Sequence, residues 1–357
     1  MNRYSSFIYL AAFFSFSTQP PVRGRSVLRP KNKSIPTIKT RWFQTEDSPY
    51  ILRNSHLEEY AIFRTFNEEY FFQNILPTEN ISYRYKPEKF VDGATLRKMV
   101  DDVLKEIELK KKEYRDFIVL RKLNFNRRKK SGLLILKCKH HPFVVKIFIE
   151  TPKSFMMHNS KGFVPIFLFY MAGGINRHLL GFTRIKNLEN LQKRLGESPR
   201  WSQLVTMPRK WFLLPQKNKW IEIEGTNIGG KKKQTTKIPG TYCVISDFVD
   251  AERRTSVFNS KDRKICMELC NYLELAIDPH IDNFMIERNT KKIAIVDTEH
   301  FLTVVGMKEK KQFTSYFLWG VDLAKSCGTA MFFRTKKARK LVQLKKSETE
   351  LTYDNRT

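Results

Sequence analysis

The chain has 357 residues and carries 65 Lys and Arg against 36 Asp and Glu, a net charge of +29, while 41% of its residues are apolar and 13% aromatic. This composition excludes a wholly disordered chain, a collagen-like repeat and a small disulfide scaffold, and it predicts a sizeable core. The positive charge predicts affinity for a polyanion such as nucleic acid, anionic lipid or a phosphate-bearing ligand. The five cysteines match no zinc or redox spacing, so we expect buried free thiols.

The N-terminus has the pattern of a targeting segment. A short basic start is followed by the apolar stretch Phe7 to Phe16, which favours a signal peptide over residues 1–19 and an exported or envelope-associated protein. The first 45 residues also lack any acidic residue, so a transit peptide or an irregular tail is the alternative, with a cytoplasmic or organellar location. No apolar run reaches the roughly 18 residues of a spanning helix, and we expect no transmembrane helix in the mature chain.

Changes in composition and periodicity divide the rest of the chain. A basic linker covers residues 20–47, and an N-terminal helical extension covers 48–115. Two folded parts follow at 116–250 and 251–345, and a tail covers 346–357. In the extension, apolar residues recur at three- and four-residue steps from Leu96 to Ile107, after a capping-type run that starts at Asp92. This spacing predicts an amphipathic helix.

Residues 116–250 have mostly the pattern of strands. Apolar, β-branched runs predict strands over 117–123, 133–138, 143–149, 211–214, 220–224 and 242–248. The first two runs flank a basic loop that contains Arg127 and Lys129 and closes at Gly132, which predicts a hairpin. Leucines at helical spacing predict a short helix over 185–195, before Gly196.

The most informative stretch follows a predicted helix over 264–275. Asp278, His280 and Asn283 lie on one predicted loop. Two short predicted strands follow this loop and lead to Asp297. Phosphoryl transfer needs a carboxylate that orients or deprotonates the attacking hydroxyl, together with oxygen ligands for Mg²⁺. Asp278 suits the first role, and Asn283 with Asp297 suits the second.

These residues resemble the protein-kinase-like superfamily, in its aminoglycoside-phosphotransferase-like and atypical branches. Asp278-Pro279-His280-Ile281-Asp282-Asn283 is similar to the catalytic loop Asp-x-His-Pro-x-Asn, with Ile281 in place of the proline, and Asp297-Thr298-Glu299 is similar to the metal-binding triplet. The resemblance implies an α+β, two-lobed fold over about residues 115–340. An antiparallel sheet would form the N-terminal lobe and a shortened, mainly helical lobe would follow, with ATP and Mg²⁺ between them.

The same resemblance assigns three residues to the nucleotide. Lys146, in the apolar strand 143–149, is the lysine that contacts the α- and β-phosphates, because an unpaired ammonium would be costly there. Glu189, on the helix 185–195, is the expected partner of this lysine, with Glu197 among the alternatives. The expected hinge between the lobes lies at about residues 243–249, where adenine would meet backbone groups beside Val244 or Ile245.

The sequence also departs from the family pattern. No glycine-rich loop precedes Lys146, and the cations of the 124–132 loop, Arg127 and Lys129 among them, are the candidates to bind phosphate by charge. The chain after Asp297 is short and lacks Ala-Pro-Glu, so regulation by a phosphorylated activation loop is not expected.

Each assignment has a structural alternative. Asp278 and Asn283 are also typical turn and cap residues, Lys146 suits a strand edge with its ammonium in solvent, and His280 is more typical of loop positioning than of catalysis. His140 and His141 lack a third metal ligand at suitable spacing.

We therefore expect a divergent phosphotransferase that moves the γ-phosphate of ATP to a hydroxyl acceptor, a protein or a small molecule. A pseudokinase scaffold or nucleotide sensor is the alternative, and a polyanion-binding protein is the third candidate.

Overall fold

The computed structural model describes residues 50–53, 65–126, 130–150, 175–226, 233–300 and 312–321. The predicted signal peptide, linker and tail lie outside the described residues, and so do Arg127 and Lys129. The described part combines several helices with mostly antiparallel sheets, which confirms the α+β class. None of its helices is both long enough and apolar enough to cross a membrane.

The N-terminal extension contains a hairpin as well as helices. Its elements are α2 (Glu68–Gln73), β2 (Asn80–Tyr83), β3 (Lys86–Asp92) and α3 (Gly93–Glu108). The side chain of Asp92 accepts a hydrogen bond from the backbone N–H of Ala94, so Asp92 caps α3 as its position predicts. The extension, which the sequence predicts as helical, thus also contains a hairpin, in which β2 and β3 pair with each other and buried Ile81 lies opposite buried Val91.

A five-stranded antiparallel sheet follows. Its strands, in spatial order, are β4 (Phe117–Asn126), β5 (Ser131–Cys138), β6 (Phe143–Ile149), β11 (Thr241–Asp247) and β8 (Lys210–Leu213). The first three strands are consecutive in the chain and form a meander, so the predicted hairpin before Lys146 is confirmed. Lys146 lies on β6, in the middle of the sheet.

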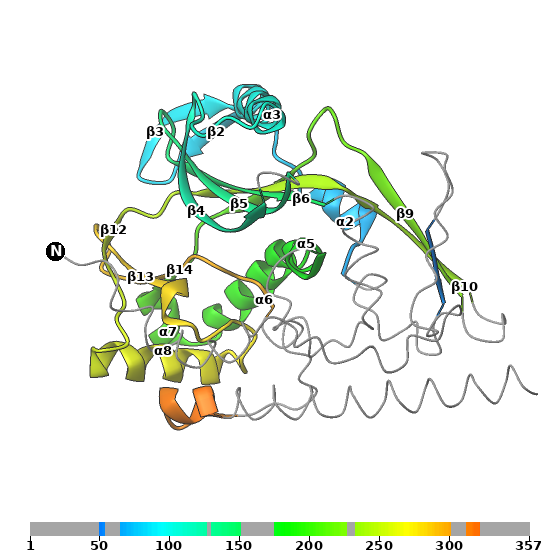
Figure 1. Cartoon of the computed structure of the whole chain (residues 1–357). Coiled ribbons are helices and arrows are strands. Elements are labelled where there is room, and N and C mark those ends of the chain that lie inside the picture. The colour runs from blue at the N-terminus through cyan, green and yellow to red at the C-terminus, as the bar shows by residue number, and fades with distance from the viewer. Residues whose placement is uncertain are drawn as a thin grey trace, which may run out of the picture. The chain divides into compact units, whose positions relative to one another are not determined.

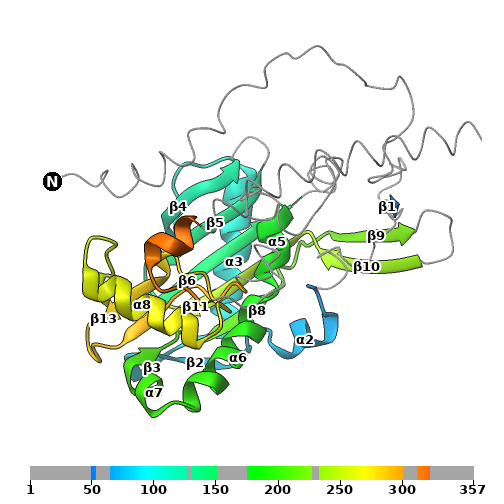
Figure 2. The same ribbon diagram turned by 90° about the horizontal axis from the view of Figure 1, so that it is seen from below.

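The two faces of this sheet have different coverings (Figure 1). One face packs against the buried side of α3, with Leu134, Leu136, Val145 and Ile147 in the contact. The other face packs against α5 (Ile175–Gly181), through Leu133, Phe148, Tyr242 and Leu179. Figure 2, seen from below, shows α5 and α6 (Arg184–Gly196) on this second side. Gly181 permits the close approach, because a Cβ there would meet the Tyr242 hydroxyl at 1.9 Å.

A second, four-stranded sheet carries the motif loop. Its order is β12 (Ala251–Arg254), β13 (Phe284–Glu287), β14 (Ile293–Ile295) and β7 (Val205–Thr206). Its core is shared with α6, α7 (Pro199–Leu204) and α8 (Ser260–Tyr272). A third sheet joins β1 (Tyr50–Arg53), β9 (Trp220–Thr226) and β10 (Lys233–Pro239).

Within residues 251–345, the described part contains α8 and a helical turn at 316–321 as well as three strands. That part holds β12, β13 and β14 alongside α8, because short β-branched and apolar runs between polar turns pair as strands. The chain passes directly between the four-stranded and five-stranded sheets twice, at residues 207–209 and 248–250.

Candidate functional site

The motif loop is held by hydrogen bonds within itself. The carboxylate of Asp278 accepts a bond from the backbone N–H of His280 at 3.1 Å, and the side-chain amide of Asn283 donates to the Asp278 carbonyl at 3.1 Å. The ring of His280 accepts from the backbone N–H of Asp282 at 3.3 Å, which starts a 3₁₀ turn over Ile281–Asn283. His280 therefore orients the loop, which is the structural interpretation that the sequence favours.

The hairpin β13–β14 brings Asp297 beside this loop. The backbone N–H of Val296 donates to the Asn283 carbonyl at 3.0 Å, and the two strands pair from Phe284 to Ile295. Asn283 and Asp297 thus come from adjacent ends of one hairpin, as the sequence predicts.

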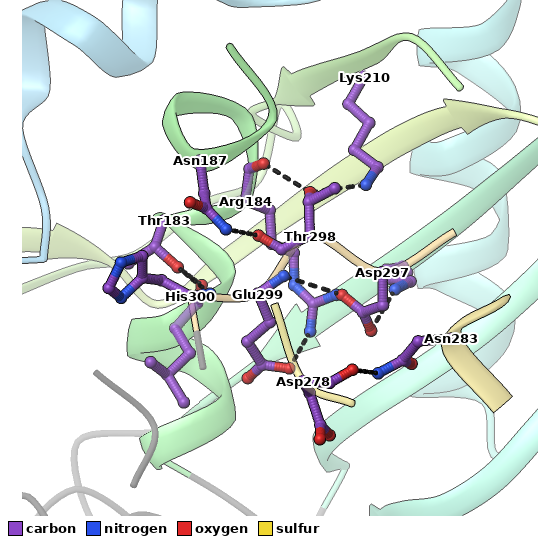
Figure 3. Close-up of polar contacts among 12 residues, drawn as sticks. Thr183, Arg184, Asn187, Lys210, Asp278, Asn283, Asp297, Thr298, Glu299 and His300 are labelled. Carbon is purple, nitrogen blue, oxygen red and sulfur yellow. Dashed lines mark hydrogen bonds and ion pairs between the residues drawn. The ribbon is translucent and has the colours of Figure 1, made fainter. Parts of the chain in front are cut away.

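Asp297 is the centre of a buried charge cluster (Figure 3). The Lys146 ammonium lies 2.9 Å from its Oδ2 atom, and the Arg184 guanidinium pairs with its Oδ1 atom. The same guanidinium also reaches Glu299 Oε2 at 2.8 Å, and the Arg184 side chain is only 1% exposed. Lys146 enters from β6 and Arg184 from the start of α6, so the triplet 297–299 joins the sheet to the helix.

Thr298, the middle residue of the triplet, is completely buried and bonded on several sides. Its hydroxyl accepts a hydrogen bond from Lys210 Nζ at 2.7 Å and donates to the Arg184 carbonyl at 2.7 Å. Its carbonyl accepts from the Asn187 amide at 3.0 Å, and that amide also donates to the Ala276 carbonyl at 2.8 Å. These bonds fix the triplet against β8, α6 and the start of the motif loop.

The cations around Asp297 control its charge. Burial alone would raise the pKa of Asp297, but the charges of Arg184 and Lys146 hold it well below its usual range, so it is ionised. Burial and the nearby Arg184 lower the pKa of Lys146 to about 8, against the attraction of Asp297. Burial, together with the charge of Lys146, holds the pKa of Lys210 well below its usual range.

Asp278 has the opposite environment. Burial raises its pKa to about 6, and the negative charges of Glu299 and Asp297 add to the rise, while the charge and backbone N–H of His280 oppose it. The negative charges of Asp297 and Glu299 therefore repel an ionised Asp278 carboxylate. A carboxylate with a pKa near neutrality is suited to take up a proton.

Strand register shows which side chains share the sheet face with Lys146. Directly opposed residues lie on the same face, and so do residues two apart on a strand. Lys146 is opposite Ile135 on β5, and the neighbouring row runs through Ile118, Val144 and Lys210. Ile118 is 50% exposed, and Ile135 and Val144 are half-buried, so an incompletely covered apolar strip lies beside the lysine. The strip is interrupted by Lys137, which stands between Ile118 and Val144 in the register.

The predicted pair of Lys146 and Glu189 is not present. Glu189 is exposed, and its negative charge adds to burial in raising the pKa of Tyr70, while Lys146 pairs with Asp297. The reason is helical geometry: the buried stripe of α6 contains Arg184, Leu188 and Leu191, and a residue at position 189 points to another side.

Val244 lies inside a strand, and the expected hinge range 243–249 overlaps a connection between the sheets only at its end. Val244 is 1% exposed in the middle of β11, paired with Lys146 on one side and Phe212 on the other. Its backbone groups belong to the sheet ladders. The chain leaves the sheet only after Asp247, at residues 248–250, where the Phe248 ring lies 3.8 Å from the Lys137 ammonium.

Sequence reasoning missed Arg184 and Lys210 as members of the site. Arg184 stands four residues before Leu188 on the apolar stripe of α6, and Lys210 precedes buried Phe212 by two residues on β8. A charged residue at a position where the apolar periodicity of a helix or strand predicts burial indicates a buried, paired charge. This signal is present in the sequence at both positions.

The residues present fit Mg²⁺ only in company with a phosphate ligand. Among the residues described, no group of three or more His, Cys, Asp or Glu side chains is arranged to hold a metal ion. Mg²⁺ commonly takes one or two protein oxygen ligands and completes its shell with water and phosphate oxygens. Asp297 and Asn283 can provide such ligands, and a divalent cation would relieve the repulsion between Asp278, Asp297 and Glu299.

Comparison with known proteins adds no family. No family model, no curated protein and no solved structure matches the chain.

Proposed function

We propose that the chain is a divergent kinase-like phosphotransferase that moves the γ-phosphate of ATP to a hydroxyl acceptor. In this proposal the five-stranded sheet is the N-terminal lobe, and the part that carries the four-stranded sheet and α8 is the second lobe. One observation supports it above the others: Lys146, on the third strand of a meander, pairs at 2.9 Å with Asp297, which follows the hairpin after the motif loop.

The proposal gives each acidic residue a role. Asp278, with a pKa raised to about 6 by burial, accepts the proton of the attacking hydroxyl near neutral pH. Asn283 and Asp297 hold Mg²⁺, and Mg²⁺, when bound, neutralises negative charge on the polyphosphate. Lys146 contacts the phosphates by charge, in exchange for part of its pairing with Asp297.

The apolar strip beside Lys146 supports a ligand with an aromatic base. Ile118, Ile135 and Val144 present apolar surface on the same face as the lysine, and Phe248 stands where the chain leaves the sheet. In the proposal the adenine lies against this strip, near residues 248–250 rather than near Val244.

A nucleotide-binding pseudokinase is the second candidate, and the Arg184 contact favours it. Arg184 occupies the Oδ1 side of Asp297 while Lys146 occupies the other, so both carboxylate oxygens are engaged by protein cations. A site in which Asp297 keeps its ion pairs with Lys146 and Arg184 would bind nucleotide without efficient transfer of the γ-phosphate.

The test measures the melting temperature of the full chain with and without Mg-ATP, followed by a γ-phosphate transfer assay. A ligand that binds only the folded state at a hundredfold excess over Kd stabilises it by about 2.7 kcal/mol. Asp297→Asn should remove most of this shift, whereas Glu252→Gln, at an exposed ion pair with Lys291, should keep it. Absence of a shift in the wild type at millimolar Mg-ATP would contradict both candidates.

Asp278→Asn separates the two candidates. If the chain is an enzyme, the Mg-ATP shift survives and transfer falls by about 10² to 10⁴, because a proton acceptor has been lost. If wild type and variant turn over ATP at the same background rate, the scaffold is the better description.

A further inference from the structure

The tip of the β2–β3 hairpin contacts both direct connections between the two main sheets. Residues 207–209 join β7 to β8, and residues 248–250 join β11 to β12. Residues 82–85 of the hairpin, which we call the brace, form hydrogen bonds to both connections or to the residues next to them. No role in the proposed reaction accounts for these contacts.

Arg84 is the central residue of the brace. Its guanidinium donates to the carbonyl of Met207 at 2.9 Å, to the hydroxyl of Thr206, and to Glu287 Oε1 at 3.1 Å. Glu287 is 1% exposed and ends β13, so Arg84 ties the first connection to the hairpin that carries the motif residues. Its planar fork of donors uses Nε, Nη1 and Nη2 to reach three acceptors in a fixed geometry.

Tyr85 and Ser82 extend the same contact. The Tyr85 hydroxyl donates to Glu287 Oε1 at 2.6 Å and accepts from the backbone N–H of Asp250 at 3.2 Å, in the second connection. The carbonyl of Ser82 accepts from Arg209 at 2.6 Å, and Arg209 also pairs with Asp247 at 2.8 Å. The brace is thus bonded to residues at or beside both connections.

We propose that Arg84 and Tyr85 are positioning residues that hold the two connections in one conformation. They would thereby set the distance between Lys146, on the five-stranded sheet, and Asp278 and Asp297, beside the four-stranded sheet. The consequence for nucleotide binding rests on the proposed function. The effect of the brace on the conformation of the two connections does not rest on the proposed function, and it can be tested separately.

The experiment is hydrogen–deuterium exchange on the full chain, followed by peptide mass analysis. Arg84→Gln and Tyr85→Phe should raise exchange at residues 206–210 and 247–251 by about fivefold or more, because local opening depends on these bonds. Arg115→Gln is the matched control, since Arg115 lies in the same extension and pairs with Asp102 and Asp116 on the surface. Exchange at both connections should be unchanged in this control.

The second measurement is the apparent Kd for Mg-ATP from melting shifts, which should rise about tenfold in Arg84→Gln and remain unchanged in Arg115→Gln. If Arg84→Gln does not fold, Tyr85→Phe decides the matter, because it removes one hydroxyl and keeps the ring. Unchanged exchange at both connections in Tyr85→Phe, or an equal rise throughout α3 and the five-stranded sheet, would overturn the proposal. If the wild type shows no Mg-ATP shift, the proposed function fails and the exchange data still decide the role of the brace.

Discussion

Lys146 and Asp297 are 151 positions apart in the chain, and their side chains form an ion pair at 2.9 Å. The pair crosses from the middle strand of the five-stranded sheet to the triplet after β14. Both groups are largely buried, so the strength of this pair depends on Arg184 and Lys210 around it. The first prediction concerns the charge that this environment leaves on Lys146.

Nucleotide binding should weaken as pH rises through about 8. The pKa of Lys146 is lowered to about 8, so its amine is charged below that pH and loses its attraction for phosphate above it. Lys146→Arg stays protonated and should flatten the profile. The measurement is the melting shift caused by Mg-ATP between about pH 7 and pH 9. Parallel profiles for the two proteins would show that another group titrates.

Asp278→Asn should stabilise the unliganded protein at neutral pH. The folded-state pKa of Asp278 is about 6, above its ordinary value of 3.8, so the ionised carboxylate destabilises the fold at higher pH and this cost disappears as pH falls below the unfolded pKa. We expect a gain of about 1 to 3 kcal/mol at pH 7 that vanishes near pH 4. Urea unfolding at several pH values measures it, and a gain that is equal at both pH values would contradict the assignment.

Arg184→Gln should be among the most destabilising substitutions in the chain. It removes the guanidinium that pairs with both Asp297 and Glu299, and loss of one partner of a buried pair commonly costs about 3 to 5 kcal/mol. The control is Arg200→Gln, which breaks a surface pair with Glu268 and should cost less than about 1 kcal/mol. Equal midpoints in urea would mean that the buried cluster contributes little to stability.

Thr298→Val should be far more harmful than Thr298→Ser. Valine has the same shape but leaves the Lys210 amine and the Arg184 carbonyl without the hydroxyl between them, at a cost of about 2 to 4 kcal/mol. Serine keeps both bonds and loses a buried methyl group, which costs about 1 kcal/mol. Thermal melting of the two variants decides this, and a smaller loss in the valine variant would show that the hydroxyl is not needed.

Local patterns predicted much of the secondary structure. The apolar spacing from Leu96 to Ile107 and the cap at Asp92 correspond to α3, and the β-branched run around Lys146 corresponds to β6. The motif residues Asp278 and Asn283 fall on one loop as expected, because five positions of chain constrain them to be neighbours. These features depend on backbone preferences and on contacts between residues that are close in the chain, and both can be predicted from the sequence.

Contacts between distant segments required the tertiary structure. Glu189 and Arg184 lie on the same helix, and only the packing of its apolar stripe decides that Arg184 faces Asp297. Val244 was misplaced because strand order, which puts β11 between β6 and β8, cannot be read from a single strand.

The pairing of Arg84 with Glu287 joins positions 203 apart in the chain. Local sequence patterns predicted α3, α8 and the strands of the five-stranded sheet, because the free energies of these elements depend on near neighbours, but they did not predict the hairpin β2–β3. The tertiary structure decided which charges meet, because burying an ion is tolerated only where the whole fold supplies its partner.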